Sequence, residues 1–153
     1  NKLFSSNWEG AVFAKAGLER VELLGSHSQE LKWMIPAPAQ GAIGVVCRAN
    51  DTELIELLKK INHQTTRECV DIERDFLRIL EGGCSAPIGA YAFIARDKIQ
   101  FKGGVFSLDG QIAATTSKEV QMADGKNLAA QAAEEVLSKG GHQILRTIKY
   151  SKE

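Results

Sequence analysis

Three stretches in the second half of the chain alternate between apolar and polar residues. Residues 88–96, 99–106 and 111–120 change character at about every second position, which is the pattern of a strand with one buried face. Asp109-Gly110 lies just before the last stretch and is a strong signal for a hairpin turn. The sequence therefore predicts three antiparallel strands.

Apolar residues at helical spacing flank these strands. A helix is expected from Thr65, because Thr65-Thr-Arg-Glu68 has the pattern of a capping box, and Gly82-Gly83 would end it. Another helix is expected over residues 126–138, closed by Gly140-Gly141. Residues 65–153 thus predict a small α+β domain with a three-stranded antiparallel sheet and helices. The apolar stripe of the first helix comprises Cys69, Ile72, Phe76, Ile79 and Leu80.

The first sixty residues contain shorter elements. Residues 10–14 predict a short strand, and residues 16–23 predict a turn of helix with Leu18 and Val21 inward. A complete core is hard to build from residues 1–35 alone. Residues 42–47 form a continuous apolar run, typical of a strand buried on both faces. Asn50 or Asp51 then caps a helix, whose apolar stripe is Leu54, Ile55, Leu57, Leu58 and Ile61.

Composition narrows the class of protein only slightly. The 153 residues suffice for one domain or two small pieces, and 19 basic residues balance 19 acidic ones. The charge therefore gives no argument for a nucleic-acid partner. No apolar run approaches the roughly 20 residues of a membrane span, and no signal peptide is visible. The absence of an initial Met suggests an excised fragment.

The cysteines predict reduced thiols in the cytoplasm. Cys47, Cys69 and Cys84 are odd in number and widely spaced, which is no disulfide framework. No C-x-x-C is present and the histidines are scattered, so we expect no metal site. Cys47 and Cys69 lie in apolar patterns and are expected in the core. Cys84 follows the predicted helix end, where it is either an exposed nucleophile on a loop or a small buried residue.

Two polar groups also leave alternatives open. Arg67, Arg74 and Arg78 share a helix face and form either a clamp for carboxylates or a solvated face paired with Glu73 and Asp75. The segment around Gln40 offers backbone amides and a side-chain amide to a ligand, or is a structural turn.

Several longer motifs resemble one enzyme family. They are Ala14-Lys-Ala-Gly-Leu-Glu-Arg20, Ile35-Pro-Ala-Pro-Ala-Gln-Gly-Ala-Ile-Gly-Val-Val-Cys-Arg48, Glu73-Arg74 and Leu80-Glu-Gly-Gly-Cys-Ser-Ala-Pro-Ile-Gly-Ala-Tyr91. In order and spacing they are similar to the C-terminal half of hydroxymethylbilane synthase, also called porphobilinogen deaminase. The resemblance covers nearly the whole chain. Pro38-Ala39 departs from it, because the family usually has Val-Gly there.

The resemblance implies a transferase of haem and tetrapyrrole biosynthesis. Such enzymes join four porphobilinogen units into linear hydroxymethylbilane, with release of ammonia, on a covalent dipyrromethane cofactor. By motif, Cys84 would hold that cofactor through a thioether. The catalytic aspartate of the family lies in the N-terminal half, so no catalytic residue is expected in this chain. The other cofactor-binding residues implied are Arg20, Ala14, Phe13, Gln40 and Arg74.

The resemblance also implies a division of the chain. Residues 1–35 would end the family's second α/β domain, residues 36–62 would return to the first α/β domain, and residues 65–153 would form the cofactor-carrying α+β domain. The full-length protein is expected to be a cytoplasmic monomer that binds porphobilinogen and the growing tetrapyrrole. The isolated chain is expected to be inactive and to self-associate. The alternatives are a non-catalytic binding module or a thiol-reactive regulatory protein using Cys84.

Overall fold

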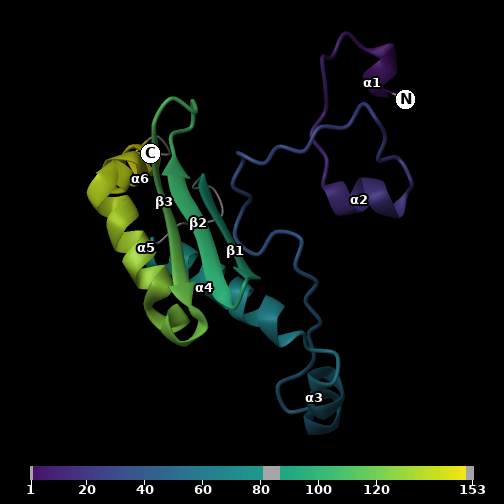
Figure 1. Cartoon of the computed structure of the whole chain (residues 1–153). Coiled ribbons are helices and arrows are strands. Elements are labelled where there is room, and N and C mark those ends of the chain that lie inside the picture. The colour runs from purple at the N-terminus through teal and green to yellow at the C-terminus, as the bar shows by residue number, and fades with distance from the viewer. Residues whose placement is uncertain (1, 81–86, 151–153) are drawn as a thin grey trace. The chain divides into compact units, whose positions relative to one another are not determined.

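A computed structural model describes residues 2–80 and 87–150 of the chain (Figure 1). It divides into two compact units, Asn1–Met34 and Ile35–Glu153. The division into three domain segments, 1–35, 36–62 and 65–153, is not tested by these two units and stays a prediction.

The first unit has little regular structure. Its helices are α1 (Lys2–Ser5) and α2 (Lys15–Arg20). The strand predicted over residues 10–14 is absent, because no neighbouring segment of the unit offers it a backbone ladder. Val21 is exposed and follows the end of α2, so the prediction that it points inward is wrong. As expected, residues 1–34 hold no core of their own in the described part, and most of their large apolar side chains are exposed.

The second unit is built on a three-stranded antiparallel sheet of order β1-β2-β3. The strands are β1 (Ile88–Ala95), β2 (Lys98–Phe106) and β3 (Ala113–Gln121), which confirms the three predicted strands. The hairpin at Asp109-Gly110 is also confirmed. Gly110 has a φ of 71°, a backbone conformation that glycine adopts without a steric penalty. The Asp109 carboxylate accepts a hydrogen bond of 3.1 Å from the Gln111 amide.

Helices supply the other half of the core. α4 (Gln64–Ile79) packs on β1 and α5 (Leu128–Val136) packs on β3 (Figure 1). Phe76 of α4 is 0% exposed and meets Phe101 of β2 edge to face, with ring centroids 5.1 Å apart. Gly103 leaves room for these rings, since a Cβ there would lie 2.9 Å from the Phe76 ring. Cys69 is buried, as its place on the apolar stripe predicted.

One more helix follows the helix that the sequence predicted to be the last. A 3-10 helix (Met122–Asn127) precedes α5, and a kink with Gly140 at φ 100° leads into α6 (His142–Tyr150). The helical conformation does break at Gly140, as predicted, but the prediction that this helix is the last one is wrong. The chain continues because Ile144 and Ile148, four residues apart on α6, reach the core. No helix of residues 2–80 and 87–150 is long and apolar enough to cross a bilayer.

Helix starts were predicted with mixed success. Asp51 caps α3 (Thr52–Lys59), because its carboxylate accepts a 3.1 Å hydrogen bond from the Leu54 amide. The capping box at Thr65 is wrong. His63 is the cap of α4, and its Nδ1 accepts a hydrogen bond from the Thr66 amide at 3.3 Å.

Residues 42–47 do not form the predicted buried strand. Ile43 is 86% exposed and Val46 is 92% exposed, while Cys47 is half-buried rather than in the core. The run has no strand beside it within the described residues, and a strand needs a neighbour to satisfy its backbone. The apolar stripe of α3 is also open to solvent, since Leu57 and Ile61 are exposed. The expected self-association of the isolated chain stays a prediction.

Candidate functional site

The connection between α4 and β1 contains Cys84. Residues 81–86 lie outside the described part of the chain, so the predicted place of Cys84 is not tested. The residues on either side are described. Leu80 and Ile88 are both buried members of the core cluster. The connection therefore starts and ends on the packed scaffold, the usual setting for functional loops.

Glu73 of α4 is buried with only 5% of its surface exposed. Its Oε1 accepts a hydrogen bond of 2.8 Å from the Ala92 amide of β1. Its Oε2 accepts one of 2.6 Å from the Ala39 amide. Burial raises the pKa of this carboxyl, while the hydrogen bonds from Ala92 and Ala39 act in the opposite direction. One carboxylate thus joins three segments that are distant in sequence.

The role expected for Glu73 was wrong. The sequence suggested a solvated salt-bridge partner for the arginines, but Glu73 bonds to backbone amides inside the fold. A signal was present in the sequence. Glu73 lies four residues after Cys69 and three before Phe76, which places it on the apolar stripe of α4. A charged residue on a buried stripe needs hydrogen-bonding partners there.

The segment that carries Gln40 lies beside β1. The Pro36 carbonyl accepts a hydrogen bond of 2.9 Å from the Ala90 amide. Ile35 covers Gly89 so closely that a Cβ on that glycine would lie 2.9 Å from Cγ2 of Ile35. The Gln40 side chain is exposed. Its residue lies in a turn in which the backbone N–H of Gln40 donates a hydrogen bond of 3.0 Å to the Ala37 carbonyl. The segment is therefore a structural turn that leaves the Gln40 side chain available.

Ala39 has a φ of 61°. This left-handed conformation costs a residue with a Cβ roughly 1–2 kcal/mol. It occurs at the position where the resembling family usually has glycine.

We expect Ala39→Gly to stabilise the chain by about 1 kcal/mol, because relief of the left-handed strain outweighs the added freedom of the unfolded chain. Denaturant unfolding measures the change. Ala37→Gly is the matched control in the same segment, since Ala37 has no positive φ, and it should be neutral or destabilising. Equal effects of the two substitutions would contradict the assignment of strain to Ala39.

The three arginines of α4 differ in their surroundings. Arg67 pairs with Asp71 at 3.2 Å, and Arg78 pairs with Asp75 at 2.6 Å. Both are exposed pairs along the helix, which contribute little to stability. Arg74 is exposed and forms no ion pair with any residue of the described ranges. Of the two open alternatives, the solvated face fits Arg67 and Arg78, whereas Arg74 remains available to an anion.

The remaining predicted site residues lie in the first unit, around α2. Ala14 directly precedes the helix and Arg20 is its last residue. Phe13, Ala14 and Arg20 are all exposed. Arg20 forms no ion pair within the described residues, while Lys15 lies 3.9 Å from both Glu19 and Glu30. The Arg20 guanidinium is therefore also available to an anion.

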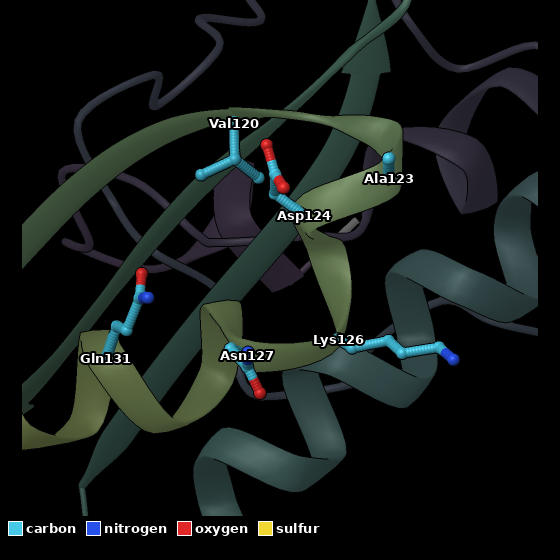
Figure 2. A pocket seen from close by; sticks show the side chains of 6 residues that line it. All are labelled: Val120, Ala123, Asp124, Lys126, Asn127 and Gln131. Atoms are coloured by element: carbon cyan, nitrogen blue, oxygen red, sulfur yellow. The ribbon is translucent and has the colours of Figure 1, made fainter.

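A pocket lies beside the 3-10 helix of the second unit (Figure 2). None of the predicted site residues lines it, so it has no part in the candidate site. No cluster of three or more metal-binding side chains occurs within residues 2–80 and 87–150. The residues that line the pocket are Val120, Ala123, Asp124, Lys126, Asn127 and Gln131.

Two family models match the chain in succession. Residues 1–56 match "Porphobilinogen deaminase, dipyromethane cofactor binding domain". Residues 67–138 match "Porphobilinogen deaminase, C-terminal domain". The second match contains most of α4, the three strands and α5; α4 holds Glu73, and α4 and β1 flank Cys84.

Individual relatives agree with both matches. The chain is 38% identical over 150 residues to porphobilinogen deaminase of Carboxydothermus hydrogenoformans, an alignment that covers 97% of this chain and 48% of that protein. It is 38% identical over 149 residues to that of Alkaliphilus metalliredigens, covering 96% and 47%. For Listeria innocua the identity is 36% over 153 residues, covering 97% and 49%. The chain spans about half the length of these relatives.

Proposed function

Since this chain belongs to the porphobilinogen deaminase family, we propose that it forms the C-terminal part of a hydroxymethylbilane synthase. The reaction is a transfer: four porphobilinogen units are joined head to tail and ammonia is released at each addition. The observation that carries the proposal is the hydrogen bonding of Glu73. It attaches the Gln40 segment to the helix and the strand that flank Cys84.

Cys84 is the residue that we propose as the anchor of the dipyrromethane. A thiolate is a soft and strong nucleophile. Its sulfur forms the bond to carbon when a porphobilinogen-derived carbon loses its amine, and the thiol proton leaves with the ammonia. The product is a thioether, which is stable to hydrolysis. Once attached, the dipyrromethane supplies a free pyrrole α-carbon as the site of chain growth.

The available polar side chains fit such a group, because each pyrrole unit carries an acetate and a propionate. Arg74 and Arg20 are exposed and free of ion pairs with described residues, and arginine binds carboxylates through two parallel hydrogen bonds. Gln40 offers an amide, while Phe13 and Ala14 would line the site. None of these residues moves a proton in the reaction. That role belongs to the family's aspartate in the other half of the protein.

The experiment is an assay of the full-length protein with porphobilinogen. We expect linear hydroxymethylbilane and ammonia as products, and an intact mass that includes the dipyrromethane. Folded full-length protein that makes no linear tetrapyrrole would contradict the proposal. A cytoplasmic location fits a soluble substrate and stays a prediction.

A second candidate applies to the 153 residues by themselves, namely a folded binding module without turnover. The observation that favours it is the placement of the core. Every buried apolar residue of the described ranges lies between Cys69 and Ile148, so the segments bearing Arg20 and Gln40 add no packed layer. Incubation of the isolated chain with porphobilinogen, followed by intact-mass measurement, distinguishes a cofactor-carrying enzyme part from a binding module. Dipyrromethane on Cys84 of the isolated chain would contradict this second candidate.

A further inference from the structure

β1 lies at one edge of the sheet (Figure 1), and its own residues do not protect that edge. The strand, Ile88–Ala95, contains no charged side chain and no proline. Proteins usually place such residues on edge strands, because the outward amides and carbonyls can pair with a strand of another molecule. The β3 edge is protected in this way, since the strand contains Lys118 and Glu119. In addition, Nζ of Lys139 donates a hydrogen bond of 3.2 Å to the Thr115 carbonyl of β3. The β1 edge therefore depends on groups from elsewhere in the chain.

Two such groups bind the outward amides of β1. The Pro36 carbonyl accepts a hydrogen bond of 2.9 Å from the Ala90 amide. Oε1 of Glu73 accepts one of 2.8 Å from the Ala92 amide. Ala90 and Ala92 are two positions apart, so both amides point to the same side of the strand, away from β2. A carbonyl and a carboxylate thus occupy the places that a neighbouring strand would fill with its carbonyls.

The two groups are joined to each other. Oε2 of Glu73 accepts a hydrogen bond of 2.6 Å from the Ala39 amide. At the start of the same segment, Ile35 lies over Gly89, where a Cβ would be 2.9 Å from Cγ2 of Ile35. Residues 35–39 and Glu73 together form what we call the edge cover. Because its parts are linked, loss of the Glu73 carboxylate should loosen the segment as well.

The uncovered strand is complementary to a second copy of itself. An antiparallel pair of β1 strands centred on Tyr91 places Ala90 opposite Ala92 of the second copy, so that each outward amide meets a carbonyl. Phe93 of the second copy then lies opposite Gly89, on the side that the edge cover occupies now. The Tyr91 and Phe93 rings already stack, with centroids 5.4 Å apart, and those of both copies would share one face of the joined sheets. The edge thus offers a second copy both hydrogen bonds and aromatic contacts.

We propose that the edge cover is a displaceable lock on β1, and that β1 pairs with β1 of a second copy when the lock is released. While the cover is in place, the Ala90 and Ala92 amides are already bonded and a second strand finds no free donors there. Pairing would also separate Glu73 from Ala92, and a carboxylate that is only 5% exposed loses a bond that compensates its burial. The closed cover therefore opposes the association, and its release permits it.

Disulfide cross-linking of the 153-residue chain tests the pairing, because Tyr91 would face Tyr91 of the second copy. Directly opposed residues that exchange no hydrogen bonds have Cα atoms about 4.5 Å apart, which lies within the roughly 4.4–6.8 Å that a disulfide spans. We expect Tyr91→Cys to give about tenfold more dimer linked at position 91 when Glu73→Ala is added, because the charge-assisted bonds that keep the cover closed are lost. Peptide mapping identifies the linked position, so association through other surfaces does not contribute.

Lys102→Cys is the matched control. Lys102 pairs with Tyr91 in the register of the sheet and is exposed, but it lies on the central strand, where no second copy can pair. It should stay unlinked with or without Glu73→Ala. Should Glu73→Ala fail to fold, Ile35→Ala takes its place with the same expectation, because it uncovers Gly89 and Ile35 is not part of the core cluster.

Hydrogen exchange at the Ala39 amide shows whether the cover has opened, and it should be about tenfold faster in Glu73→Ala. Unchanged exchange would overturn the role of Glu73 in the lock. Faster exchange without a link at position 91 would overturn the pairing with a second copy. Equal yields of linked dimer from Tyr91→Cys and Lys102→Cys would mean random collision and would overturn the proposed register.

Discussion

Replacing Cys84 with serine in the full-length protein is expected to abolish covalent attachment of the dipyrromethane. A serine hydroxyl is a far weaker nucleophile than a cysteine thiolate and does not replace it without a base to activate it. Intact mass should therefore show the bare polypeptide, and the product assay should show no hydroxymethylbilane.

The same substitution should leave the fold of the second unit intact. The core cluster is built from residues of α4, the sheet, α5 and α6, with Leu80 and Ile88 as its members on either side of the connection. Circular dichroism of Cys84→Ser should match that of the wild type. Cys47→Ser is the control, because Cys47 is a half-buried free thiol outside the proposed site. Loss of the native spectrum in Cys84→Ser alone would show that Cys84 is a structural residue.

The sheet was the part of the fold that the sequence predicted best. β3 alternates between buried and more exposed residues along its length, and such alternation is legible in a single sequence. Thr116 of β3 is buried while Ser117 beside it is exposed. The turn at Asp109-Gly110 was equally legible, since its geometry depends on the two residues themselves.

The errors occurred where distant residues decide the local structure. Gly140-Gly141 has the sequence of a helix end, and Gly140 does adopt a positive φ. Yet the chain re-enters a helix, because Ile144 and Ile148 find space on the core. The run 42–47 is the opposite case. Its residues favour a buried strand, but no partner strand lies within the described chain.

In the candidate site, too, the sequence did not predict what depends on residues distant in the chain. Its exposed members were predicted from motifs, and Arg74 and Gln40 are accessible. Glu73 was misplaced, because its partners are two backbone amides that no side-chain pattern records. The sequence showed only the conflict, which is a carboxylate on the apolar stripe. Such conflicts between local pattern and burial occur preferentially at functional or strained positions.

Phe76→Ala is expected to have the largest effect on stability. Phe76 is 0% exposed and its ring meets Phe101 edge to face at 5.1 Å. Truncation of a buried phenylalanine removes its transfer free energy and leaves a cavity, which together cost about 3–5 kcal/mol. Gly103 cannot fill that cavity, since it has no side chain and lies beneath both rings. The loss is a large part of the roughly 5–15 kcal/mol that stabilises a domain.

Thermal unfolding followed by circular dichroism measures the effect. A domain of this size loses on the order of 4–8 °C in Tm for each kcal/mol of stability. The Tm of Phe76→Ala should therefore be lower than that of the wild type by at least about 12 °C, or the variant should fail to fold at 37 °C. Ile79→Ala is the matched control on the same helix, because Ile79 is 44% exposed whereas Phe76 is fully buried, and substitutions at exposed positions usually stay within about 0.5 kcal/mol. Similar Tm values for the two variants would mean that α4 does not rest on the sheet through Phe76, and that the hold of Glu73 on β1 has some other support.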